Sequence, residues 1–116
     1  MEKEYTGIII MESLTDDRVL SDLEFLDFKV TKEDNPVDRW HMFKVKVSLE
    51  DIEKLSNIIK NKWYMHFWKG RDIIAIFKGK QFKFNFDNKE TWKDAVEYGK
   101  SIGIPEEQLD FPINSW

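Results

Sequence analysis

The segment Ile73–Phe77, with the sequence IIAIF, is the longest uninterrupted apolar run in this chain of 116 residues. It is far too short to cross a membrane, which takes about 20 apolar residues. In an extended strand, successive side chains point to opposite faces of the sheet, so both faces of this segment are apolar. The segment therefore predicts a central strand in a sheet that is covered on both faces.

Five other short segments show the alternation or the apolar content that is typical of strands. The six strands that we expect span residues 5–12, 24–31, 40–47, 62–68, 72–78 and 80–86. In the second of these, strict alternation places Leu26, Phe28 and Val30 on one face, with Asp27 and Lys29 on the other.

Two segments carry the signals of helices. Ser48 is a favourable N-cap, Asp51 follows three residues later in the position of a capping box, and apolar residues then recur at spacings of three and four. Asp87 and Glu90 give the same signal for a second helix, which we expect from about residue 89 to residue 102.

The expected order of elements is three strands and a helix, followed by three strands and a helix. Neither half can cover its strands alone, so this βββα–βββα order predicts an α+β fold in which two main helices pack on a mostly antiparallel sheet. The alternative is a ferredoxin-like arrangement with an added hairpin and helix, which would use a short helix within residues 15–22. No linker rich in Pro, Gly or Ser divides the chain, so we expect residues 1–116 to form a single domain.

The composition excludes several classes of protein. The chain has no Cys, which excludes a disulfide framework, a thiolate nucleophile and zinc sites with Cys ligands. Aromatic residues make up 15% of the chain, far more than disordered segments contain. The first residues are acidic and lead into no long apolar stretch, so we expect no secretory signal, no membrane span and a cytoplasmic location.

The formal net charge of −4 hides an uneven distribution of charge along the chain. Residues 60–83 contain 7 basic and 1 acidic side chains, whereas residues 1–59 contain 8 and 14 and residues 84–116 contain 3 and 7. Blocks of opposite charge can attract each other across a dimer interface, and a basic block can attract phosphate.

Nucleic-acid binding through residues 60–83 is therefore one alternative function. Basic and aromatic residues interleave near Lys83, as they do in proteins that bind single strands. However, alternation places Phe82, Phe84 and Phe86 on the face opposite Lys83, where we expect them to be buried. The isoelectric point of about 5.2 also weakens attraction to phosphate, so we do not expect nucleic acid to be the main partner.

The densest aromatic stretch, WYMHFW at residues 63–68, provides the candidate binding site. Alternation puts Tyr64, His66 and Trp68 on one face, where a planar aromatic or a cationic ligand could stack. His41, the second of two histidines, is a further candidate if its strand lies beside this one. The chain has none of the spacings of a metal site, a phosphate-binding loop or a hydrolase nucleophile, so we expect no catalytic residue, no metal and no cofactor.

Several short segments between residues 63 and 111 are distinctive together: WYMHFW, then TWK, EYG and GIPEEQLDF. In these segments the chain resembles a small family of uncharacterised prokaryotic proteins. The resemblance implies a stand-alone bacterial or archaeal domain, but no activity, cofactor or site residue.

The leading functional hypothesis is a small cytoplasmic, non-catalytic binding or interaction domain that forms a homodimer. It depends on the lack of catalytic motifs, the many aromatic residues and the complementary charge blocks. The alternatives are a small-molecule-binding protein or enzyme with an aromatic pocket centred on His66, and a weak nucleic-acid binder.

Overall fold

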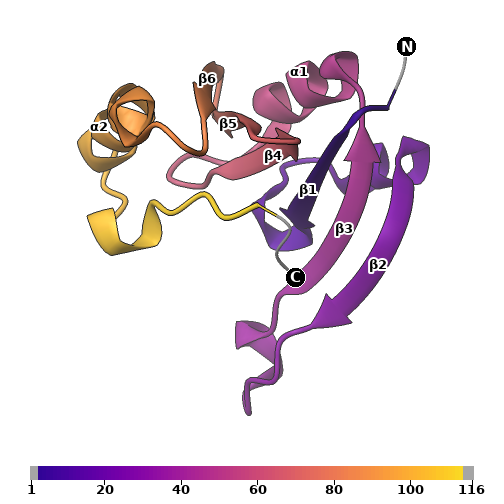
Figure 1. Cartoon of the computed structure of the whole chain (residues 1–116). Coiled ribbons are helices and arrows are strands. Elements are labelled where there is room, and N and C mark those ends of the chain that lie inside the picture. The colour runs from indigo at the N-terminus through magenta and orange to yellow at the C-terminus, as the bar shows by residue number, and fades with distance from the viewer. Residues whose placement is uncertain (1–2, 114–116) are drawn as a thin grey trace.

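A computed structural model describes residues 3–113 and shows one six-stranded antiparallel sheet with two α-helices (Figure 1). The order of strands across the sheet is β2-β3-β1-β4-β5-β6. The predicted α+β class and the order βββα–βββα are confirmed. In chain order, the elements are β1 (Tyr5–Ile10), β2 (Glu24–Val30), β3 (His41–Val47), α1 (Leu49–Ile58), β4 (Met65–Lys69), β5 (Asp72–Phe77), β6 (Lys80–Asn85) and α2 (Lys93–Ser101). Short 3-10 helices span Met11–Ser13, Asp17–Asp22, Pro36–Asp38, Lys89–Trp92 and Glu106–Gln108.

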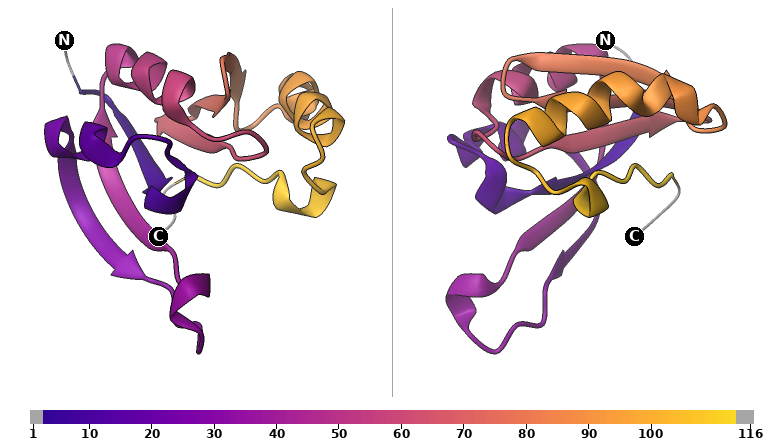
Figure 2. Two further views of the ribbon diagram at one scale, coloured as in Figure 1. Left: turned by 180° about the vertical axis from the view of Figure 1, so that it is seen from behind. Right: turned by 90° about the vertical axis from the view of Figure 1, so that its left-hand side faces the viewer.

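The two α-helices cover opposite faces of the sheet. In the right-hand view of Figure 2, α2 lies in front of β4–β6 and α1 lies behind them. Ile74 and Ile76 of β5 belong to the core under α1, whereas Ile73 and Phe77 belong to the core under α2. The prediction that this strand is covered on both faces is therefore confirmed, but the strand is second from the edge of the sheet and not at its centre.

The segment after α2, residues 104–113, packs on the same face as α2, and we call it the C-terminal strap (Figure 1). Its side chain Phe111 is fully buried against Phe84 and Trp92, with ring centroids 5.0 and 5.4 Å away. Leu109 packs against Gly99, where an added Cβ would lie 2.6 Å from a Leu109 methyl carbon. The strap therefore completes the core beneath α2.

The first predicted helix begins as expected, and the second does not. The Ser48 hydroxyl accepts a hydrogen bond from the Asp51 N–H at 3.1 Å, and the Asp51 carboxylate accepts one from the Ser48 N–H at 3.0 Å. The second helix begins with a 3-10 turn that is capped by Asn88, so the prediction of Asp87 as N-cap is wrong. Asp87 instead pairs with Arg71, whose Nε lies 3.0 Å from a carboxylate oxygen.

All six strands are shorter than the predicted ranges, and β1 and β4 differ from them most. β1 ends at Ile10 because the chain turns into a 3-10 helix, where the Ser13 hydroxyl donates to the Ile10 carbonyl at 2.6 Å. β4 starts at Met65 rather than at residue 62 because Lys62 adopts a left-handed conformation, with φ of 67°. Residues 17–22 form a 3-10 helix and not the α-helix that the ferredoxin-like alternative requires.

Strands β2 and β3 form a hairpin that extends beyond the rest of the sheet, and we call residues 24–47 the β2–β3 arm (Figure 1). A register shift between Phe25 and Asp27 marks a β-bulge. As a result, Phe25 and Phe28 both contact Phe43 of β3, with ring centroids 5.3 and 4.9 Å away. The prediction of strict alternation did not include this bulge, which brings Phe25 to the same face as Phe28.

The two halves of the sheet join where β1 meets β4. The register pairs Thr6 with Trp68 and Gly7 with Phe67, and no further residues of these two strands. A Cβ added at Gly7 would overlap the ring of Phe67 and lie 2.9 Å from the His66 carbonyl oxygen. Since Phe67 is fully buried, its ring has no room to move away. Gly7 therefore permits the approach that joins the halves.

We predict that Gly7→Ala lowers the free energy of unfolding by about 1–3 kcal/mol, the usual cost of overpacking a core. Urea denaturation followed by circular dichroism measures this loss. The control is Thr6→Ala on the neighbouring residue, whose effect should be smaller because it adds no atom. Equal stability of Gly7→Ala and the natural protein would contradict this account.

Candidate functional site

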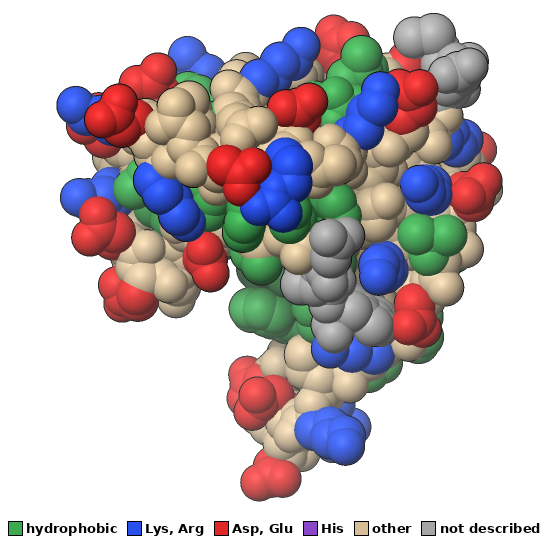
Figure 3. Space-filling model, in the orientation of Figure 1, with side chains coloured by type: hydrophobic (Ala, Val, Ile, Leu, Met, Phe, Trp, Pro, Cys, Tyr) green, Lys and Arg blue, Asp and Glu red, His purple; other side chains and the backbone are tan. Residues whose placement is uncertain are grey.

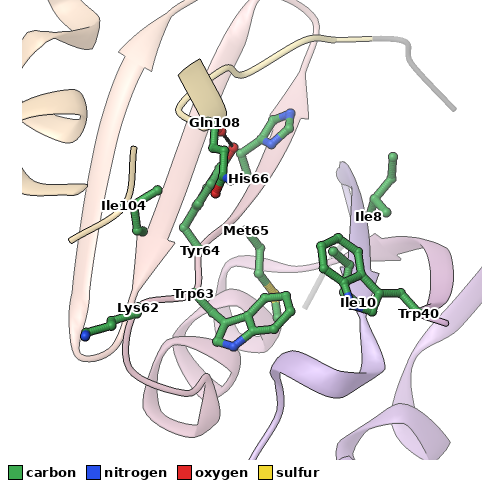
Figure 4. A pocket seen from close by; sticks show the side chains of 10 residues that line it. All are labelled: Ile8, Ile10, Trp40, Lys62, Trp63, Tyr64, Met65, His66, Ile104 and Gln108. Atoms are coloured by element: carbon green, nitrogen blue, oxygen red, sulfur yellow. Dashed lines mark hydrogen bonds between the residues drawn. The ribbon is translucent and has the colours of Figure 1, made fainter. Parts of the chain in front are cut away.

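A hollow of about 430 Å³ opens where β1 and β4 separate (Figure 4). The two strands pair at Gly7 and Phe67 but no longer pair one residue further on, so Ile8 and Ile10 of β1 face Met65 and His66 across a gap. The size lies within the range of about 300–1,000 Å³ that is usual for small-molecule pockets.

The lining of this hollow is mainly apolar and aromatic. Trp40, which precedes β3, and Trp63, which precedes β4, meet edge to face with their ring centroids 5.4 Å apart (Figure 4). The lining residues are Ile8, Ile10, Trp40, Lys62, Trp63, Tyr64, Met65, His66, Ile104 and Gln108. None of these carries a carboxylate, so the lining suits an uncharged aromatic ligand better than a cation.

Two of the predicted site residues, Tyr64 and His66, lie on the wall of the hollow, and both hold the C-terminal strap. His66 Nε2 donates to the Pro112 carbonyl oxygen at 2.7 Å. The Tyr64 hydroxyl donates to the Gln108 carbonyl and lies 3.3 Å from that of Asp110. These side chains therefore use their polar atoms to fix the chain that follows α2.

Burial sets the protonation of both residues. It lowers the pKa of His66 below the ordinary value of 6.5, although the hydrogen bond to Pro112 and the charge of Asp110 oppose this effect. Near pH 7, His66 is thus neutral, and its proton is on Nε2, which donates to the Pro112 carbonyl oxygen. Burial also raises the pKa of Tyr64, which keeps its hydroxyl protonated as a donor.

The other two predicted site residues do not line the hollow. Trp68 lies on the same face of β4 as His66, with the ring centroids 5.5 Å apart, but it is buried in the core beneath α2 and does not reach the hollow. His41 lies at the start of β3, where its Nδ1 is 2.7 Å from a carboxylate oxygen of Glu12 and its N–H donates to the other at 2.8 Å. Burial alone would raise the pKa of Glu12. The hydrogen bonds from His41 have a larger combined effect in the opposite direction, so the pKa of Glu12 lies below its ordinary value.

The described residues hold no group of three or more His, Asp or Glu side chains that could bind a metal ion. The part of the chain that the structure describes also has no helix long and apolar enough to span a bilayer.

The basic block does not form a platform for stacking nucleic-acid bases on β6. Phe84 is buried against Trp92, and Phe82 packs on Phe77 and Tyr98. Lys83 is exposed on the opposite face, as its alternation with the Phe side chains predicts. Lys83 and the Phe side chains of β6 are therefore on opposite faces of the sheet, whereas Arg71 and Lys80 lie over the rings of Phe86 and Tyr98, 4.8 and 5.8 Å from their centroids.

The β2–β3 arm carries most of the exposed large apolar side chains of the described chain. They are Phe25, Leu26, Phe28, Val30, Val37 and Trp40, and Leu49 on α1 is the remaining one. Phe28, in the middle of β2, is 51% exposed. Figure 3 shows hydrophobic side chains at the surface between the arm and the body of the molecule. Sequence patterns alone do not predict this surface, because its exposure depends on the position of β2 at the edge of the sheet.

Comparison with protein-family models, with curated proteins and with solved structures finds no match to this chain.

We predict that His66 makes stability depend on pH. A histidine whose pKa is lowered by folding binds a proton more readily in the unfolded chain than in the folded one. The contribution of His66 to the free energy of unfolding is therefore fully present above pH 6.5 and is lost as the pH falls below that value. His66→Gln should reduce the loss of unfolding free energy between pH 7.5 and 5.5, as measured by urea denaturation. The matched variant is His41→Gln, which should keep the part of the pH dependence that comes from His66. If the pH profile of His66→Gln equals that of the natural protein, the prediction is wrong.

Proposed function

We propose that the protein is a small non-catalytic binding domain of the cytoplasm that self-associates through β2 of the β2–β3 arm. The observation that carries the proposal is the concentration of exposed apolar side chains on this one arm. Single exposed apolar residues are common, but a contiguous group of them marks an interaction surface.

One ring nitrogen of each histidine has a structural use within the chain. His66 uses Nε2 for the Pro112 carbonyl, and His41 is held by Glu12 through both its ring and its backbone. The described contacts thus give each histidine a structural partner within the chain.

The position of β2 favours a second copy of this chain as the partner. β2 is an edge strand of the sheet, and every residue from Glu24 to Val30 is exposed. An edge strand offers unpaired backbone groups that another strand can bind. Since most homo-oligomers have two-fold symmetry, the same edge on a second copy is the natural partner for it.

We predict that Phe28→Ser weakens self-association about tenfold or more, because it removes a large aromatic group from the middle of the interface. Sedimentation velocity over a range of concentrations measures the dissociation constant. Leu49→Ser is the matched control, because Leu49 is 48% exposed but lies on α1, outside the arm. The proposal is wrong if the natural protein remains monomeric at millimolar concentration.

We propose, as a second candidate function, that the hollow between β1 and β4 binds a planar uncharged aromatic molecule. The observation in its favour is the pair formed by Trp40 and Trp63, whose rings lie at the hollow together with Ile8, Ile10 and Met65. Offset and edge contacts between aromatic rings stabilise such a ligand beyond the area that it buries.

Indole is the probe that tests this candidate. We expect its titration to shift the indole N–H signals of Trp40 and Trp63 in two-dimensional NMR spectra, while those of the buried Trp68 and Trp92 stay in place. Trp40→Ala should weaken indole binding about three- to tenfold, the range expected for an aromatic pair. Val37→Ala is the control on the same arm. Equal shifts for Trp40, Trp63, Trp68 and Trp92 would indicate non-specific binding and contradict the candidate.

A further inference from the structure

We propose that two copies of the chain join their β2 strands as antiparallel neighbours around a two-fold axis at Phe28. This inference rests on the proposed self-association and specifies its register. It depends on three features of β2: the direction of its backbone groups, the order of its charges and the hydrogen bond of Asp27.

Hydrogen bonds show which backbone groups of β2 face the free edge. The Thr31 N–H donates to the Trp40 carbonyl at 3.0 Å, so Thr31 directs its backbone groups toward the chain that leads into β3. In an antiparallel ladder this direction alternates along the strand. Lys29 and Asp27 therefore also direct their backbone groups to β3, whereas Phe28 and Val30 direct theirs to the free edge.

The Phe28 N–H at this edge is already occupied within the chain. It donates to a carboxylate oxygen of Asp27 at 2.8 Å. This hydrogen bond satisfies a donor that would otherwise be open to any passing strand. Asp27 thus protects the edge in the free protein, as charged side chains commonly do on edge strands.

Among the registers centred on residues 27, 28 and 29, the order of charges favours the one centred on Phe28. With Phe28 on the two-fold axis, Asp27 of each copy lies opposite Lys29 of the other, which gives two pairs of opposite charge. An axis at Asp27 would oppose two carboxylates, and an axis at Lys29 would oppose two ammonium groups. Directly opposed like charges destabilise a pair of strands, so both of these registers are disfavoured.

The same register changes the partner of Asp27. The Phe28 N–H can donate to the Phe28 carbonyl of the second copy, while Asp27 turns to Lys29 of that copy. An unrelated strand that has no cation opposite Asp27 would also displace its carboxylate from the Phe28 N–H, but would offer it no new partner. The exchange therefore favours a second β2 over an unrelated strand.

The apolar face of the arm is continuous across this pairing. Phe28 of each copy would lie side by side on the face that Phe25 and Phe43 already form within one chain. Val30 pairs with His41 in the register and extends this face toward the end of the strand. Aromatic side chains in opposed positions of neighbouring strands stabilise a sheet.

The test uses two charge reversals, Asp27→Lys and Lys29→Asp, each in the full chain. Each variant alone places like charges opposite each other in the dimer, so we expect its dissociation constant to rise about tenfold or more. When the two variants are mixed, every pair is again of opposite charge, and we expect a mixed dimer. Native mass spectrometry detects this species when one variant is labelled with ¹⁵N.

Controls separate this effect from general changes in charge. Asp38→Lys and Lys54→Asp carry the same reversals outside β2, and mixing them should not change their dimerisation. Because Asp27 lies opposite Lys44 of β3, near-ultraviolet circular dichroism is used to check that each variant is folded. If a reversal prevents folding, Asp27→Asn and Lys29→Gln replace it, and the dimer of the natural protein should weaken with added NaCl more than that of the doubly neutral variant.

The outcomes distinguish the two levels of the proposal. A natural protein that is monomeric at all concentrations overturns the proposed function and the register together. A dimer that is unaffected by either reversal, or variants that fail to form a mixed dimer, overturns the register but leaves self-association in place. A mixed dimer stronger than either homodimer supports the register.

Discussion

The contact between Gly7 and Phe67 is the constraint on which the rest of the sheet depends. It is the point at which β1, held by β3 on one side, reaches β4 on the other, and the pairing extends over two residues on each strand. Because this junction is so short, the strands separate immediately beyond it and form the walls of the hollow. The same residue that joins the halves of the sheet thus determines where the sheet opens.

Local patterns in the sequence were enough to predict much of the fold. The capping box at Ser48 and the apolar strand Ile73–Phe77 needed no distant partner, and both predictions are confirmed. The wrong predictions concern features of local structure that depend on contacts with residues far away in the chain. Asp87 was a plausible cap, but Arg71, in the turn between β4 and β5, competes for its carboxylate. The bulge at Leu26 likewise depends on the register with β3, which the sequence of β2 alone does not contain.

The candidate site was predictable only in part, for a similar reason. Tyr64, His66 and Trp68 lie on the one face that alternation predicts, because that relation is local. Trp68 is two residues further on, but at that point β1 has joined the sheet and the strand is buried under α2. Trp40 lies 23 residues before Trp63 in the chain, and only the strand order brings the two rings into contact. Sequence patterns describe each strand well, but they do not describe what lies beside it.

The strand order also has a consequence for how the protein folds. The β2–β3 hairpin and the β4–β5–β6 meander each pair strands that are neighbours in the chain, so both can form locally. β1 must enter between them, and its contact with β4 closes a loop from Gly7 to Phe67. Until β1 takes its place, the facing edges of β3 and β4 are both unpaired and open to other chains. The insertion of β1 therefore removes both of these edges from the sheet.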